Sequence, residues 1–302
     1  MSGTLARNPA SEFPVARTVE AVRLAVREAR AAGRSIGLVP TMGALHEGHA
    51  RLIEACRAEA EFVVVSIFVN PTQFGPGEDF SQYPRTFEAD LALCARAGAH
   101  AIFAPGVEVL YPHGGGSTFV EVPGPSALLE GAMRPGHFRG VATVVLKLLQ
   151  AVGPDVAAFG LKDYQQLAVI RRMVADLLVP TRLLAVATVR EADGLAMSSR
   201  NRYLDGPQRR AAVVLSQALR RASAAVQDGE GDADRVRQIL RESVESEPLA
   251  RLEYAEVADA ETLEPLAGPH GSQRAVALLA VRIGPARLID NTILPERAPR
   301  CS

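Results

Sequence analysis

The sequence predicts an α/β protein built on a doubly wound parallel sheet, with a smaller α+β domain at its C-terminal end. Short apolar runs alternate with amphipathic helical stretches from about residue 18 to residue 188, which is the pattern of a parallel sheet covered by helices on both faces. After about residue 189 this alternation stops, and long Ala- and Arg-rich helical stretches precede a group of strands. A chain of 302 residues is long enough for one large or two modest domains.

The first elements have clear boundaries in the sequence. A helix is expected over residues 18–32, because three valines share one face and Gly33 ends the pattern. The apolar run 36–39, which ends at Pro40, is expected to form a short buried strand. A second helix is expected after His49, where apolar residues again recur at helical spacing.

The rest of the first domain continues the same alternation. The next strand, 62–69, is β-branched and almost wholly apolar, as expected of a parallel strand covered on both faces. The elements expected after it are helix 86–97, strand 100–103, helix 140–152, strand 156–159, helix 163–177 and strand 182–188. Ligands of such sheets bind beyond the carboxyl ends of the strands, so functional residues are expected in the loops that follow strands.

The C-terminal part has a different pattern. Two amphipathic helices are expected over 207–226 and 232–244, separated by an Asp-Gly-Glu-Gly stretch. Strands are expected over 252–257, 275–281 and 287–288. We therefore predict one domain over residues 1–188 and a smaller one over 189–302, joined by a hinge near 189–193.

Composition excludes several classes of protein. Lys and Arg number 33 and Asp and Glu number 34, so the net charge of −1 provides no basic field to hold nucleic acid. The three cysteines, Cys56, Cys94 and Cys301, are scattered without CxxC spacing, which argues against a disulfide framework or a structural zinc site. Cys56 and Cys94 are expected to pack as small apolar groups on helices.

The chain also lacks the marks of membrane insertion or secretion. No segment approaches the ~18 consecutive apolar residues of a membrane-spanning helix. Residues 1–12 lack the apolar core of a secretion signal and are expected to form a frayed arm, and residues 295–302 are expected to be disordered. We therefore predict a cytoplasmic protein with no membrane partner.

The stretch VPTMGALHEGH, residues 39–49, is the most informative part of the chain. It places His46 and His49 where a strand turns into a helix, with Gly48 between them. A helix N-terminus presents unpaired N–H groups and a partial positive charge, which suit a phosphate. Two imidazoles there can donate to phosphate oxygens as negative charge builds in a transition state. The alternative is an ordinary glycine-containing loop with two surface histidines.

Five more motifs occur in order along the chain. They are SIFVNPTQF at 66–74, YPRT at 83–86, EGAMRPGHFRGV at 130–141, FGLKDYQQL at 159–167 and DGLAMSSRN at 193–201. Together with the HxGH stretch they resemble the pantoate–β-alanine ligase family, which belongs to the adenylyl-transferring superfamily that includes class I aminoacyl-tRNA synthetases. The similarity runs from about residue 36 to residue 204, with a weaker echo at 286–291.

This resemblance implies a Rossmann-like first domain, a second domain that acts partly as a lid, and a homodimer. It implies ATP-dependent condensation of (R)-pantoate with β-alanine through pantoyl adenylate, with ATP as co-substrate and Mg²⁺ as cofactor. His46, His49 and Lys162 would be catalytic, and Gln73 and Gln166 would bind pantoate and β-alanine. The ATP-binding residues that it implies are Met42, Gly43, Ala44, Leu45, His46, Glu47, Gly48, His49, Gly160, Leu161, Lys162, Asp163, Val189, Met197, Ser198, Ser199 and Arg200.

Some of these residues also have chemical support of their own. The Gln73 amide follows an apolar strand and can donate to a carboxylate while accepting from a hydroxyl. Lys162 opens a helix, where a cation opposes the helix dipole, so a role in holding phosphates is expected. Asp163 is equally well explained as a helix N-cap. The hydroxyls and guanidinium of residues 198–200 suit phosphate recognition, although most serine-rich loops have no such role.

Three positions leave alternatives open. Asp90 is a candidate magnesium ligand, since Mg²⁺ prefers carboxylates and phosphates, but an acid at a helix start is often only solvated. The basic segment 134–140 is interpreted as a mobile flap over an anionic substrate, with a solvated loop as the alternative. Leu161 stands where the family commonly has glutamate, and we expect it to be tolerated because backbone contacts there can persist.

Two other functions compete with the ligase reaction. One is a nucleotidyltransferase of the same superfamily that acts on a phosphorylated substrate, against which Gln73 and Gln166 argue because they resemble a hydroxy-acid pocket. The other is an ATP-binding regulator without catalytic activity, for which Leu161 is the only support. Both histidines, Lys162 and Arg200 are present and argue against it.

Overall fold

The computed structural model describes residues 6–8, 11–115, 117–269 and 273–295. By its contacts the chain forms two compact units, the first made of residues 1–161 and 169–187 and the second of residues 162–168 and 188–302. The predicted domain division at residues 188 and 189 stays a prediction. Nothing in the sequence pattern indicated that residues 162–168 group with the C-terminal part.

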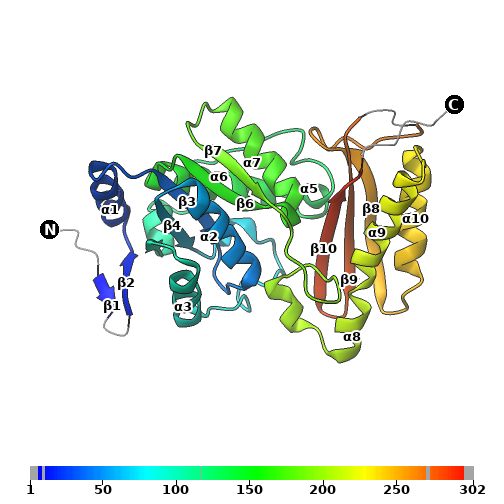
Figure 1. The fold of residues 1–302 in the computed structure, drawn as a ribbon, viewed down its shortest axis with the longest axis horizontal. Helices are drawn as coiled ribbons and strands as arrows, with labels where there is room; N and C mark the ends of the chain where they lie inside the picture. The colour runs from blue at the N-terminus through cyan, green and yellow to red at the C-terminus, as the bar shows by residue number, and fades with distance from the viewer. Residues whose placement is uncertain (1–5, 9–10, 116, 270–272, 296–302) are drawn as a thin grey trace. The chain divides into compact units, whose positions relative to one another are not determined.

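A sheet of seven strands forms the centre of the first unit (Figure 1). Its order is β1-β2-β5-β4-β3-β6-β7, and all neighbours pair in parallel except β1 and β2, which are antiparallel. The strands are β1 (Ala6–Asn8), β2 (Ser11–Ala16), β3 (Ile36–Thr41), β4 (Phe62–Ile67), β5 (Ala101–Phe103), β6 (Val156–Gly160) and β7 (Arg182–Val186). The predicted doubly wound parallel sheet is confirmed.

The order of the strands places a topological switch between β3 and β6. From β3 the chain proceeds outward through β4 and β5, whereas β6 returns to the other side of β3 and continues to β7. The two central strands pair directly, with Gly37 opposite Val156 and Leu38 opposite Ala157. Ligands of doubly wound sheets bind beyond the carboxyl ends of the strands at such a switch, and both the HxGH stretch and the FGLKD stretch follow these two strands.

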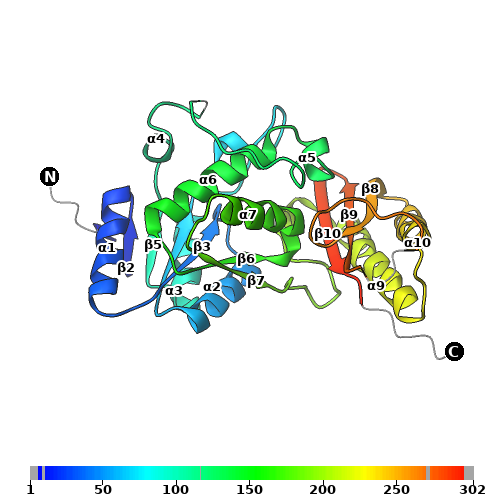
Figure 2. The same ribbon diagram turned by 90° about the horizontal axis from the view of Figure 1, so that it is seen from above.

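Helices cover both faces of this sheet (Figure 2). On one face are α2 (Glu47–Glu59) and α3 (Phe87–Ala97), and on the other are α1 (Val19–Ala31) and α6 (His137–Val152). The core beneath α2 and α3 contains Cys56, Cys94 and Val65, all fully buried. The prediction for these two cysteines is confirmed, and burial raises the pKa of each thiol to about 12.

The remaining elements up to residue 203 carry several of the motif residues. They are η1 (Pro71–Gln73), α4 (Val107–Leu110), α5 (Glu130–Met133), η2 (Leu161–Asp163), α7 (Tyr164–Asp176) and η3 (Ser199–Tyr203).

The expectation of a frayed arm over residues 1–12 is wrong for the residues described there. Strands β1 and β2 pair with each other, and β2 continues the parallel sheet, with Val15 opposite Ile102 on β5. The strand signal is weak because β2 contains Pro14, which cannot donate a backbone hydrogen bond. Residues 1–5 and 9–10, and residues 296–302 of the predicted disordered tail 295–302, lie outside the described part.

The second unit is built on a three-stranded antiparallel sheet in the order β10-β9-β8, with helices packed against it (Figure 1). Its elements are α8 (Gly206–Ala211), α9 (Val214–Gln227), α10 (Ala233–Glu245), β8 (Ala250–Asp259), β9 (Ala275–Ile283) and β10 (Ala286–Ile293). The predicted helix 207–226 is therefore two helices, with a break at Ala212 and Val213. The apolar faces of α9, α10 and the sheet form one core cluster that includes Leu215, Leu240 and Val281.

Within the described ranges, none of the helices is both long enough and apolar enough to cross a membrane.

Candidate functional site

The HxGH stretch forms a tight turn between β3 and α2, which we call the HxGH turn and define as residues Met42–His49. Gly43 has φ +81° and Ala44 has φ +51°, so two successive residues adopt the left-handed conformation. For an alanine this conformation is unfavourable and needs local compensation. Within this segment His46 is the N-cap of α2, so the helix starts at Glu47 and not after His49 as predicted.

The two histidines hold each other in place through the backbone. The Nδ1 atom of His46 accepts from the Gly48 N–H at 3.2 Å, and the Nδ1 atom of His49 accepts from the His46 N–H at 3.2 Å. The ring centroids lie 4.2 Å apart. Because each Nδ1 acts as an acceptor, the ring hydrogen of each neutral imidazole is placed on Nε2. The pair therefore presents N–H donors at the positive end of a helix, as an anion site requires.

A buried carboxylate supports the same turn from α3. Asp90 is 2% exposed and accepts hydrogen bonds from the N–H groups of Ala44 at 3.0 Å and Leu45 at 2.8 Å. Its assignment as a magnesium ligand stays a prediction. Across the residues that the structure describes, no group of three or more His, Cys, Asp or Glu side chains is arranged to hold a metal ion.

Gln73 lies at the end of η1 and is brought against the HxGH turn. Its Nε2 donates to the Met42 sulfur at 3.1 Å, and its Oε1 accepts from Asn70 Nδ2, also at 3.1 Å. The residue is only 8% exposed, so its amide is oriented by partners on both sides. Asn70 is in turn fixed by the Tyr111 hydroxyl, which donates to its Oδ1 at 3.0 Å. The sequence pointed to Gln73 but not to this supporting role of Asn70.

Helix α6 approaches the backbone of η1 closely at Gly140. A Cβ atom at this position would lie 2.4 Å from the carbonyl oxygen of Thr72 and 2.7 Å from the Cα atom of Gln73. Asn70 Nδ2 also donates to the Gly140 carbonyl at 3.1 Å. The position of Gln73 therefore depends on the absence of a side chain at residue 140.

The basic segment 134–140 is held by specific contacts. Two nitrogens of Arg134 donate to the two carboxylate oxygens of Glu78, at 2.7 and 2.6 Å. His137 Nδ1 donates to the Gln73 carbonyl at 2.8 Å, so its Nε2 accepts from Arg134 at 3.1 Å. The flap interpretation stays a prediction, but these contacts tie the start of α6 to the backbone of Gln73.

The electrostatics of this cluster follow from its burial. Burial alone raises the pKa of Glu78, but hydrogen bonds and charge from Arg134 outweigh it and leave this pKa below its ordinary value. Burial, together with the nearby Arg134 charge, lowers the pKa of His137 to about 4. His137 is therefore neutral at pH 7, as its acceptor role toward Arg134 requires.

A cavity of about 470 Å³ opens beside the HxGH turn, at the carboxyl ends of β3, β4 and β5. Met42, Gly43 and Asp90 contribute to its wall, and Arg17 and Arg85 add guanidinium groups. A cavity at this edge of the sheet with cationic walls suits an anionic ligand. Arg17 lies in no sequence motif, so only the fold reveals its place here.

The second unit carries the remaining predicted residues. Lys162 and Asp163 lie in η2 directly after Gly160 and Leu161, with the Lys162 ammonium 3.6 Å from an Asp163 oxygen. The Lys162 side chain is 21% exposed, and its carbonyl accepts from the buried Asn291 amide at 2.7 Å. Gln166 follows on the first turn of α7 and is half-buried.

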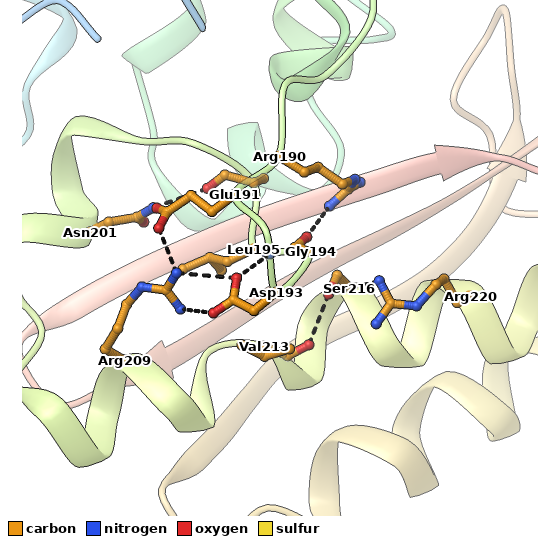
Figure 3. A network of polar contacts seen from close by, with 11 residues as sticks. Arg190, Glu191, Asp193, Gly194, Leu195, Asn201, Arg209, Val213, Ser216 and Arg220 are labelled. Carbon is orange, nitrogen blue, oxygen red and sulfur yellow. Dashed lines mark hydrogen bonds and ion pairs between the residues drawn. The ribbon is translucent and has the colours of Figure 1, made fainter. Parts of the chain in front are cut away.

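The predicted phosphate loop also has a defined backbone. We call residues Val189–Tyr203 the 189–203 loop, and Figure 3 shows its polar contacts. Arg190 and Ala196 form an antiparallel bridge, and the Met197 N–H donates to the Val189 carbonyl at 3.0 Å. The Ser198 hydroxyl then caps η3 by accepting from the Arg200 N–H at 3.3 Å. Ser199 and Arg200 open this helical turn.

Side chains brace the outer part of the 189–203 loop. Arg209 on α8 donates to Glu191 at 2.6 Å and to Asp193 at 2.7 Å (Figure 3). Glu191 in turn accepts from the Asn201 amide at 3.0 Å. Asp193 and Asn201 belong to the DGLAMSSRN motif, but no motif pointed to Arg209 or Glu191.

The root of the loop is attached to β10. Arg190 donates to both oxygens of Asp290, at 2.7 and 3.0 Å. Asp290 lies in the stretch 286–291, which resembles the family only weakly and suggested no role for this residue. This ion pair holds the first residues of the loop against the second sheet.

The structure thus groups the predicted site residues into two sets, each ordered within its own unit. The first set joins the histidine pair, the rest of the HxGH turn and Gln73, with Gly160 and Leu161 after the adjacent strand β6. The second set comprises Lys162, Asp163, Gln166, Val189 and the residues from Met197 to Arg200. Their individual roles toward ligands stay predictions.

Known proteins resemble this chain over nearly its whole length. The family model described as pantoate-beta-alanine ligase matches residues 14–293. A pantothenate synthetase from Pelotomaculum thermopropionicum is 53% identical over 282 residues, which cover 93% of this chain and 99% of the relative. The crystal structure of pantothenate synthetase from Thermus thermophilus superimposes with a TM-score of 0.87 at 47% identity, covering 93% of this chain and 99% of that one.

A third comparison concerns a structure with ligands. Pantoate-beta-alanine ligase from Francisella tularensis, in a complex with beta-gamma ATP and beta-alanine, has a TM-score of 0.75 and 34% identity, and the match covers 92% of this chain and 97% of that one. The motifs, the fold and the length of the matches all indicate the same family. The chain belongs to the pantoate–β-alanine ligase family.

Proposed function

We propose that this chain catalyses the ATP-dependent condensation of (R)-pantoate with β-alanine to give pantothenate, AMP and pyrophosphate. The observation that carries the proposal is the histidine pair, because the backbone engages both Nδ1 atoms and so places the ring N–H donors on Nε2 at the start of α2. Family membership supports the choice of substrates. The proposed reaction needs no covalent enzyme intermediate, and both described cysteines are buried in the core.

The first step is adenylation of pantoate. A carboxylate oxygen of pantoate attacks the α-phosphorus of ATP, the bond to the β-phosphate oxygen breaks, and pyrophosphate leaves with the electron pair. His46 and His49 stabilise the charge that builds on the phosphate oxygens, with the N-terminus of α2 adding its partial positive charge. Lys162 and residues Ser198, Ser199 and Arg200 would neutralise the departing phosphates.

The second step is amide formation. The neutral amine of β-alanine attacks the acyl carbon of pantoyl adenylate, AMP leaves with the electron pair of the broken C–O bond, and the nitrogen loses a proton. Gln73 orients the acid for both steps, since its amide can donate to a carboxylate and accept from a hydroxyl. Gln166 is also proposed to bind pantoate.

Magnesium is proposed to accompany the ATP phosphates. Mg²⁺ retains several waters and binds through one or two carboxylates together with substrate phosphates. Asp90, the carboxylate that the sequence favours, fits this role poorly because it is buried and both its oxygens accept backbone N–H groups. The proposed steps are therefore described by the residues of the chain alone.

Exchange of radiolabelled pyrophosphate into ATP tests this proposal. The reaction should require pantoate, and β-alanine should convert the exchange into net release of AMP. Exchange that requires a phosphorylated acceptor instead would indicate a nucleotidyltransferase, and ATP binding without exchange would indicate a regulator. The predicted homodimer and cytoplasmic location stay predictions, and light scattering of the purified chain measures the first.

A further inference from the structure

The HxGH turn rests on a carboxylate that the proposed reaction does not use. Asp90 Oδ2 accepts the Ala44 N–H at 3.0 Å and Asp90 Oδ1 accepts the Leu45 N–H at 2.8 Å. The Thr86 hydroxyl donates to Oδ1 at 3.1 Å. With 2% of its surface exposed, Asp90 is one of the few buried charged residues of the first unit.

The backbone of the turn explains why an anion is needed there. Successive N–H groups that follow residues in the left-handed conformation converge and form a concave anion site. Gly43 and Ala44 both have positive φ, and the N–H groups of Ala44 and Leu45 converge on the Asp90 carboxylate. Hydrogen bonds to a charged acceptor are stronger than neutral ones and can offset the strain at Ala44.

The residues around the Asp90 carboxylate are also closely packed. A Cβ atom at Gly43 would lie 3.0 Å from Asp90 Oδ2 and 3.2 Å from a methyl carbon of Ile67. The turn is therefore packed directly onto the carboxylate, and a side chain at Gly43 would press on both neighbours. Any displacement of Asp90 has to move the residues that immediately precede His46.

The same contacts argue against a metal at Asp90. An ionised carboxylate offers about four lone-pair positions, and three are directed at N–H or O–H donors. Although Asp90 borders the cavity, a cation there would have to replace donors that already compensate the charge. In the part of the chain with described side chains, no cluster of three metal-binding residues includes Asp90.

We propose that Asp90 is a positioning residue that fixes the HxGH turn, and through it the two imidazoles, for adenylyl transfer. This proposal rests on the proposed function. The carboxylate acts on the backbone of Ala44 and Leu45, two and one residues before His46, and so sets the direction in which α2 and its capping histidines begin. Asp90 itself touches neither substrate nor metal.

The test is the variant Asp90→Asn, with Glu54→Gln as a matched control that removes an exposed carboxylate from α2. Asparagine can accept only one of the two backbone hydrogen bonds. We expect its pantoate-dependent exchange rate to fall at least ~10-fold, with the half-saturating Mg²⁺ concentration changed less than ~2-fold. A rate that recovers when Mg²⁺ is raised would overturn the proposal and restore the metal assignment.

Two further measurements separate positioning from general damage to the fold. In the double variant Asp90→Asn/His49→Ala, the Asp90 effect should shrink, because a residue that acts through the histidines is non-additive with them. Amide exchange of Ala44 and Leu45 should accelerate in Asp90→Asn while amides of β4 stay protected. Additive rate losses together with unchanged exchange at these amides would refute the proposal.

The result also separates this inference from the proposed function. If the wild-type protein shows no pantoate-dependent exchange, the proposed function fails, whereas the amide-exchange comparison still reports whether Asp90 holds the turn. If the wild-type protein is active and Asp90→Asn behaves like Glu54→Gln, only the positioning role is lost.

Discussion

The HxGH turn of the first unit and the 189–203 loop of the second are held by different kinds of contact. The turn is fixed through its backbone by Asp90, which is 2% exposed. The loop is braced through side chains by Arg209, Glu191 and Asp193, whose side chains are 25%, 34% and 43% exposed. Exposed ion pairs are weakened by water and salt, whereas buried charge-assisted hydrogen bonds are not. The comparison indicates a rigid turn in the first unit and a more adjustable loop in the second.

The loop nevertheless has one firm attachment at its root. The side chain of Asp290 is 1% exposed and receives two hydrogen bonds from Arg190, which also donates to the Gly194 carbonyl at 3.1 Å. The acids of the outer brace, Glu191 and Asp193, are by contrast open to solvent. Hydrogen bonds from Arg209 lower the pKa of Asp193, so this brace stays ionised over a wide range of pH. We therefore expect the outer part of the loop to respond to ionic strength and its root not to.

The largest expected effect concerns the rigid element. His49→Ala removes a donor next to the reacting phosphate and should slow adenylation by roughly 10²–10³-fold, the usual loss for one such donor. Pantoate binding should change little. Pyrophosphate exchange at saturating substrate measures the rate, and the exposed His113→Ala is the control. Normal turnover of His49→Ala would contradict the role given to the HxGH turn.

Acid should weaken the first unit through His137. Its pKa is about 4 in the folded chain and about 6.5 when unfolded, so the unfolded state binds more protons between these values. The contribution of neutral His137 to the free energy of unfolding is complete above pH 6.5. It is lost as the pH falls toward 4, and the loss is on the order of 2–3 kcal/mol. Urea unfolding at several pH values measures this.

The variant His137→Gln provides the control for that measurement. Glutamine can still donate to the Gln73 carbonyl but does not titrate, so this part of the pH dependence should disappear. An unchanged slope between about pH 4 and 6.5 would assign the acid sensitivity to other groups.

A smaller effect is expected at the acid pocket. Gln73→Ala should weaken pantoate by about 10-fold and ATP much less, since a hydrogen bond to a charged group contributes about 1.5 kcal/mol or more. Steady-state KM values for both substrates measure the difference, with the exposed Gln82→Ala as control. Weakened ATP with unchanged pantoate would reverse the assignment of this residue.

The smallest effect belongs to the exposed brace. Arg209→Gln should lower the exchange rate by only about 3-fold at low salt, because surface ion pairs contribute roughly 0–1 kcal/mol. The difference from wild type should vanish as salt is raised, since screening weakens the wild-type brace. Arg210→Gln, exposed on the same helix, is the control. A large effect that persists in high salt would show that the loop is as rigid as the turn.

Local patterns predicted most of the first unit. The alternation of apolar runs and helical stripes was sufficient for β3, β4, α3 and α6, because each has its own period and its own glycine or proline boundary. The HxGH motif identified the histidine pair. The break at Ala212 was missed because the apolar stripe continues across it.

Contacts between distant residues could not be predicted in the same way. Asp90 lies more than 40 residues from the turn that it supports, and its position in a first helical turn favours a solvated acid when read locally. Likewise, Arg209 and Glu191 become partners only when α8 folds against the loop. Such pairs are determined by the path of the chain and have no periodic signal.

At Gly140 the stability of the helix and the position of Gln73 favour different residues, because a single Cβ atom would help the first and harm the second. Alanine in a helix interior is favoured over glycine by about 1 kcal/mol, so selection for heat resistance favours a methyl group on α6. That methyl would collide with the Thr72 carbonyl and displace Gln73, which is proposed to orient the acid. Selection for substrate acceptance therefore keeps the position empty. An inhibitor that binds beside Gln73 would therefore be hard to evade by substitution at residue 140, because one added carbon there would also displace Gln73 itself.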